Sequence, residues 1–139
     1  MIGQIRDGVS LCLAKAYPEH TIYGDARVKQ GLLTPCFFVG MGECTERTLP
    51  NGMREIRQMV EVVCFPEEQG EIAKLWEVGS EVMTLLSTLT LADGSKLTGV
   101  SRRCMMQDDL MHVYAVYYLR LRPVQEYGMM EELLQQTML

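Results

Sequence analysis

The stretch "LMHVYAVYYLRLR", residues 110–122, decides the fold of this chain. It is rich in valine and tyrosine, which are enriched in β-strands. Met111 and Val113 alternate with Tyr114 and Val116, so both faces of such a strand are substantially apolar. A strand that is apolar on both faces is typical of the middle of a sheet. The stretch therefore predicts a central strand.

Two predicted hairpins surround this strand. Residues 97–107 form the partner strand, joined to it by a turn at Gln107-Asp108-Asp109. Residues 36–48 and 53–65 also alternate in polarity, and "LPNGM" lies between them. Asn-Gly between two strand-like runs is a strong hairpin signal. We therefore predict a second long antiparallel hairpin.

Two helices are predicted from apolar residues spaced at helical intervals. Residues 3–17 place Ile5, Val9 and Leu13 on one face, and Pro18 ends the pattern. The second helical stretch follows Pro66 and runs to about Leu89, with a stripe that includes Trp76. This stripe predicts that Trp76 anchors the second helix in the core.

The predicted fold class is α+β, with residues 1–139 forming one domain. It is a two-layer fold, in which one antiparallel sheet consists of the two long hairpins and a short strand at residues 21–23. Two helices pack on this sheet. "EELLQQ", residues 131–136, predicts a short C-terminal helix.

Composition excludes several classes of protein. The net charge of −5 argues against a broad basic surface for nucleic acid. No apolar run approaches the roughly 20 residues of a membrane helix, and the N-terminus has no signal-peptide layout. We therefore expect a soluble cytoplasmic protein without a membrane partner. The five cysteines form no CxxC pair, so reduced thiols are expected in place of disulfides.

We predict no catalytic, metal-binding or cofactor-binding residues. His20 and His112 are far apart in sequence, and neither lies in a recognisable nucleophile motif. "GMGECTER", residues 40–47, contains a GxG, but it lies within a predicted hairpin strand and does not open a helix. The absence of such motifs favours a structural protein over an enzyme.

The predicted hairpins carry charged tips that project beyond a small core, and residues 25–34 form a polar loop. Projecting elements of this kind serve as contacts in symmetric assemblies. Methionine pairs near the C-terminus suit a surface that must re-pack. The candidate interface residues are Arg27, Lys29, Gln30, Arg47, Asn51, Arg54, Gln107, Asp108, Asp109, Met129 and Met130.

The stretch "IYGDARVKQGLLTPCFFVGM", residues 22–41, resembles the tail terminator family of prophages and phage-tail-like particles. The family plan has an "IYG" strand end, a loop carrying "QG", and a proline before an aromatic strand. The later segments "REIRQMVEVVCF" and "YYLRLRP" are similar as well. The eleven methionines and five cysteines are not part of this pattern.

The resemblance implies a structural protein that caps the tail tube as a ring, usually a hexamer. The cap ends polymerisation of the tube and joins the tail to the neck or collar protein. In contractile tails it also contacts the sheath. DNA only passes through the lumen when a head is present. The protein would assemble in the host cytoplasm and then become part of the virion or tail-like particle.

Two other interpretations stay open at this stage. The chain could be another neck or head-completion protein of the same particle. From a different class, it could be a small-molecule-binding or enzymatic domain with His112 and the cysteines in a pocket.

Overall fold

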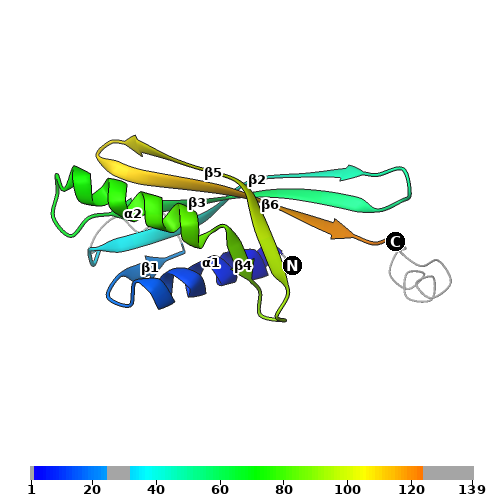
Figure 1. Ribbon diagram of the computed structural model, residues 1–139, viewed down its shortest axis with the longest axis horizontal. Helices are drawn as coiled ribbons and strands as arrows, with labels where there is room; N and C mark the ends of the chain where they lie inside the picture. The colour runs from blue at the N-terminus through cyan, green and yellow to red at the C-terminus, as the bar shows by residue number, and fades with distance from the viewer. Residues whose placement is uncertain (1, 25–31, 124–139) are drawn as a thin grey trace.

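The computed structural model describes residues 2–24 and 32–123, as eight elements (Figure 1). The elements are α1 (Ile2–Ala16), β1 (Thr21–Tyr23), β2 (Cys36–Thr48), β3 (Arg54–Phe65), α2 (Ile72–Leu85), β4 (Thr88–Thr90), β5 (Lys96–Gln107) and β6 (Leu110–Leu121). Neither helix of this described part is long and apolar enough to cross a membrane.

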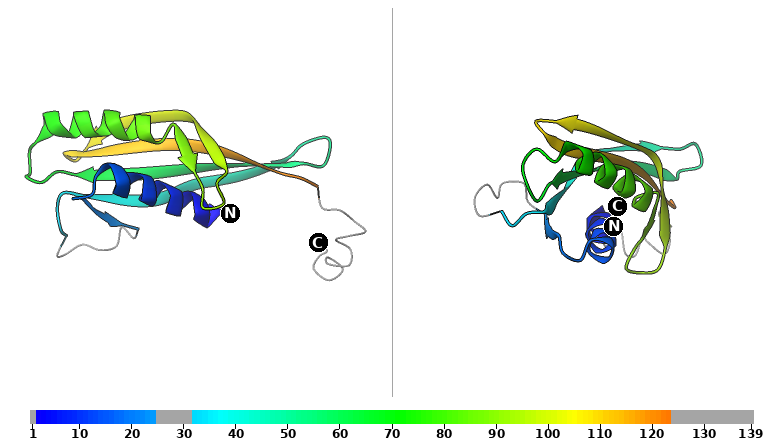
Figure 2. Two further views of the ribbon diagram at one scale, coloured as in Figure 1. Left: turned by 60° about the horizontal axis from the view of Figure 1, so that its bottom comes forward. Right: turned by 60° about the vertical axis from the view of Figure 1, so that its left-hand side comes forward.

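The predicted fold class is wrong, because the structure is mostly β and its six-stranded sheet is mixed. The strand order is β1-β2-β3-β6-β5-β4. β1 pairs with β2 in parallel, and every other pair is antiparallel. The sheet is also curled, as the two views of Figure 2 show. The predicted C-terminal helix at residues 131–136 lies outside the described residues.

A short strand was missed because its residues continue an apolar pattern of helical spacing. The helix predicted to run to about Leu89 stops at Leu85, and β4 follows at Thr88–Thr90. β4 pairs with the start of β5, where Leu89 lies opposite Leu97. Leu89 is fully buried. A buried leucine satisfies a strand and a helix equally well, so periodicity could not separate the two.

β6 is the central strand that its sequence predicts. It pairs with β3 on one side and with β5 on the other. Met111, Val113, Ala115 and Tyr117 on its helix-facing side are fully buried. On the other side of the strand Val116 is also buried.

Both helices pack on the same side of the sheet and share one core with it. Ile5, Val9 and Leu13 of α1 are fully buried, as the predicted helical face requires. In α2 the buried residues are Leu75, Gly79 and Val82. Trp76 does not anchor the helix, because 47% of its surface is exposed. It sits one residue after Leu75, which turns its side chain away from the buried stripe.

Tyr117 joins the central strand to the end of α2. Its buried hydroxyl donates a hydrogen bond of 2.6 Å to the carbonyl of Leu86. The same carbonyl lies only 2.5 Å from where a Cβ atom on Gly99 would stand. The amide of Gly99 in turn donates to the carbonyl of Ser87. Glycine is therefore required here because the backbone of the helix end lies directly against β5.

The aromatic residues that follow Pro35 in β2 pack at the start of that strand. Phe37 is fully buried and stacks on the ring of His20, with centroids 4.6 Å apart. Phe38, on the opposite face of β2, packs against Tyr23 of the adjacent parallel strand. Burial lowers the pKa of His20 below its usual value. Phe37 therefore belongs to the main core, whereas Phe38 is buried on the opposite face of the sheet.

We expect Gly99→Ala to destabilise the fold by about 1–3 kcal/mol, because the added methyl group would overlap the Leu86 carbonyl. Urea denaturation followed by circular dichroism measures this loss. Gly40→Ala is the matched control, since a Cβ atom at Gly40 of β2 meets nothing within 4 Å. Equal stability of the two variants would contradict the close approach at Gly99.

Candidate functional site: a projecting charged arm

The β2–β3 hairpin continues past both helices and projects from the body of the protein (Figure 1). We call residues 44–58 the arm. A β-bulge separates the arm from the core, because Met41 pairs with Val60 whereas Cys44 pairs with Gln58. Bulges bend a strand and increase its twist. The arm therefore leaves the core with its own direction.

Gln58 holds the bulge in place. Its side chain is 1% exposed, and its amide nitrogen donates to the carbonyls of Gly42 at 3.2 Å and Met59 at 2.8 Å. These two bonds use both amide hydrogens. A buried polar group that is fully bonded fixes local geometry, because leaving either bond unmade would be costly. The base of the arm is therefore well defined.

The tip of the arm is a closed turn. The amide of Leu49 donates to the carbonyl of Met53 at 2.7 Å. The side-chain oxygen of Asn51 accepts a hydrogen bond from the Met53 amide at 3.0 Å. Gly52 has a φ of +85°, which glycine adopts at no steric cost. The predicted Asn-Gly turn is confirmed.

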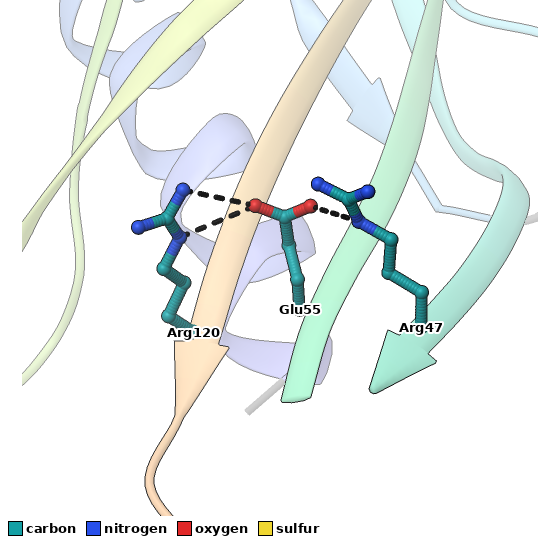
Figure 3. Close-up of polar contacts among 3 residues, drawn as sticks. All are labelled: Arg47, Glu55 and Arg120. Carbon is teal, nitrogen blue, oxygen red and sulfur yellow. Dashed lines mark hydrogen bonds and ion pairs between the residues drawn. The ribbon is translucent and has the colours of Figure 1, made fainter. Parts of the chain in front are cut away.

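One carboxylate links three strands where the arm is still supported by β6. Arg47, Glu55 and Arg120 lie in one cross-strand row of β2, β3 and β6. The Arg47 Nε atom is 2.8 Å from one carboxylate oxygen of Glu55, and Arg120 lies 3.2 Å from the other (Figure 3). The Glu55 side chain is only 8% exposed. The hydrogen bond from Arg47, followed by that from Arg120, holds the pKa of Glu55 below its usual value.

Two further ion pairs, one within the arm and one between the arm and the bulge, are more open to solvent. Arg54 lies 3.4 Å from Glu46, with both side chains more than 40% exposed. Arg57 lies 3.5 Å from Glu43. Exposed pairs of this kind contribute little to stability, typically about 0–1 kcal/mol. Their charges therefore remain available for contact with another molecule.

The side of the sheet without helices carries polar contacts as well. The Nδ1 atom of His112 lies 2.8 Å from a carboxylate oxygen of Glu61. On the next strand, the guanidinium of Arg103 lies 4.5 Å from the ring centre of Tyr114. These residues share neighbouring cross-strand rows of β3, β6 and β5. His112 is therefore part of a polar sheet face.

The cysteines and His112 do not share a cavity, as the pocket interpretation would require. Cys12 lines a cavity of about 390 Å³ and Cys64 lines a smaller one, and His112 lines neither. Cys64 lines a cavity of about 110 Å³ together with His20, Pro35 and Leu75. Sites for small molecules are usually larger, about 300–1,000 Å³. Burial raises the pKa of the Cys64 thiol to about 12, which makes it a poor nucleophile at neutral pH. Within residues 2–24 and 32–123, no three potential metal-ligating side chains come together.

The predicted interface residues fall into three groups. Arg47, Asn51 and Arg54 belong to the arm. Gln107, Asp108 and Asp109 lie at the β5–β6 turn, at the opposite end of the sheet (Figure 1). Arg27, Lys29, Gln30, Met129 and Met130 lie outside the described residues. Sequence reasoning missed Glu55, because only the cross-strand register shows that it lies between two arginines.

A model of the phage tail terminator protein family matches residues 4–129 of the chain. The chain belongs to this family. A search of the curated proteins found none that matches. The family assignment covers all six strands, α2 and all but the first two residues of α1. The resemblance predicted from the sequence is therefore confirmed.

Membership of the tail terminator family gives the protein a structural role in tail completion. It is a component of the phage tail and interacts with other tail proteins. The family also indicates a protein that is not an enzyme. The projecting arm carries exposed charges, which suits contact with another protein.

We expect Glu55→Gln to lower the thermal unfolding midpoint by a few degrees at neutral pH, because the charged pairing with Arg47 and Arg120 is lost. Glu46→Gln is the control. It alters an exposed pair on the same arm and is expected to change the midpoint less.

The difference in thermal unfolding midpoint between wild type and Glu55→Gln should depend on pH. Because the folded-state pKa of Glu55 is lowered, its stabilisation is present above the usual glutamate range and is lost as the pH falls through the folded-state value. Thermal unfolding from pH 7 to pH 3 measures this. A difference that stays constant into acid would contradict the ionic role of Glu55.

Proposed function

We propose that this protein caps the tail tube as a ring and so ends its polymerisation. The observation that carries the proposal is the charged arm of a tail terminator family member, which extends beyond the core that stabilises the fold. Residues that only stabilise a subunit have no need to project from it. An arm with exposed ion pairs is instead suited to contact with a neighbouring tail protein.

The subunit offers two opposite ends for contact, which is what a cap requires. The arm, with Arg47, Asn51 and Arg54, forms one end, and the turn at Asp108 and Asp109 forms the other. In our proposal one end contacts the tube protein, and the other contacts the neck or collar protein. Gln107 belongs to the same end as Asp108. Arg27, Lys29, Gln30, Met129 and Met130 lie outside the described residues and stay proposed contacts without an assigned surface.

We further propose that several copies, six by resemblance to the family, form the ring. The net charge of −5 suits a lumen through which DNA passes without binding tightly. In a contractile tail the ring would also contact the last sheath layer. Assembly would take place in the host cytoplasm, before the ring becomes part of the particle.

Deletion of this gene in the producing strain tests the proposed function. Electron microscopy should show tails of excessive and uneven length, which a plasmid copy of the gene restores to normal. Tails of normal length without attached heads would instead make this protein a neck component. Normal tails with heads attached would remove the proposed role altogether.

We expect Arg54→Ala to leave the thermal midpoint nearly unchanged but to impair rescue of tail length at least severalfold. The Arg54–Glu46 pair is exposed, so its loss costs the fold little, whereas a partner of the arm would lose a charged contact. Lys74→Ala is the matched control, because the exposed Lys74 side chain pairs with Glu71 at the start of α2, away from the arm. Equal rescue by both variants would count against the arm as a contact surface.

A further inference from the structure

The sheet has two long strand edges that its own short edge strands leave uncovered. β1 pairs with β2 only over Cys36–Phe38, so in the described part of the chain no strand covers β2 from Val39 to Thr48. β4 pairs with β5 only over Lys96–Thr98, and no described strand covers β5 from Ser101 to Gln107. Uncovered edges present backbone groups that can pair with another strand.

From these edges we propose that the β5 edge of one copy pairs with the β2 edge of the next copy. This inference rests on the proposed ring and identifies the joint between its subunits. The occupant of each edge is a second copy of this chain.

Strand direction favours this pairing. The strands β2, β3, β6 and β5 are neighbours in the sheet, and each runs antiparallel to the one before it. β2 and β5 therefore run in opposite directions. A neighbouring copy in the same orientation places its β2 antiparallel to this β5, so the sheet continues without a reversal. The contact is head-to-tail, which is the type of interface that closes into rings.

Charge is compatible with a register that places two exposed or partly exposed cysteines opposite each other. Cys44 and Cys104 lie near the middles of the two open edges and on the same, helix-facing side of the sheet, since Cys44 pairs with Gln58 and Cys104 with Val113. Placing the two cysteines opposite each other brings Glu46 opposite Arg102. Opposite charges in directly facing positions stabilise an antiparallel pair.

The stagger between the two edges matches a closed ring. Cys104 lies in the cross-strand row of Val62, whereas Cys44 lies in the row of Gln58, four residues further along β3. Four residues correspond to about 14 Å, and four strands span about 19 Å. A neighbour that pairs in this register is therefore shifted along the strands as well as across them. The line between equivalent points of the two copies is tilted by about 35° from the perpendicular to the strands. Strands in closed barrels tilt by a similar angle, about 35–45°.

Cysteine cross-linking in assembled particles tests this joint. All variants carry Cys12→Ser, because Cys12 is only partly buried, whereas Cys36 and Cys64 are buried. A short bis-maleimide reagent should give a ladder of covalent oligomers on a denaturing gel. Mass spectrometry of the peptides should identify a link between Cys44 and Cys104.

Each single variant, Cys44→Ser or Cys104→Ser, should lose at least nine-tenths of the cross-linked product. Co-expression of the two variants should restore a dimer but no longer oligomers, because each subunit then carries only one of the two thiols. Cross-linking in Cys104→Ser alone would mean that two β2 edges meet, and it would overturn the head-to-tail joint.

The outcome is separable from that of the proposed function. Absence of the Cys44–Cys104 link in particles whose tails have normal length would overturn the joint and leave tail termination intact. Normal tails after deletion of the gene would remove the terminator role, whatever the cross-linking shows.

Discussion

The position of β6 in the middle of the sheet is the constraint on which the rest of the structure depends. β3 and β5 flank this strand, and its helix-facing side supplies a large part of the core. Because β3 runs beside β6 as far as Arg54, the arm is three strands wide up to its turn. A two-stranded hairpin alone is marginally stable in water. The arm can therefore project from the core and still keep a fixed shape.

The helices depend on the same strand. The hydroxyl of Tyr117 bonds the carbonyl of Leu86 and so fixes where α2 ends. Gly99 lets β5 approach that carbonyl, and β4 can then pair with β5. A single buried junction thus sets the end of the helix and the start of the edge strand. The fold is organised around backbone contacts at this point as much as around apolar packing.

Sequence reasoning found the long elements and failed where the deciding contacts are distant in the chain. The alternation in residues 110–122 predicted a central strand, and Asn51-Gly52 predicted the arm's turn; both are confirmed. The parallel pairing of β1 with β2 could not be predicted, because three residues carry no periodicity. Trp76 was misplaced because its spacing in the helix is one residue from the buried stripe. Glu55 was missed because its contacts with Arg47 and Arg120 depend on the register of three strands, which cannot be read from the sequence.

The small size of β1 and β4 has a consequence for the free subunit. Each covers three residues of an edge, so within residues 2–24 and 32–123 two ladders stay uncovered, and such ladders are prone to wrong pairing and aggregation. The bulge and the charged residues Glu43 and Glu46 interrupt one ladder, and Arg102 and Arg103 charge the other. Two β5 edges therefore repel each other through their arginines, which disfavours one wrong pairing while leaving unlike edges free to meet.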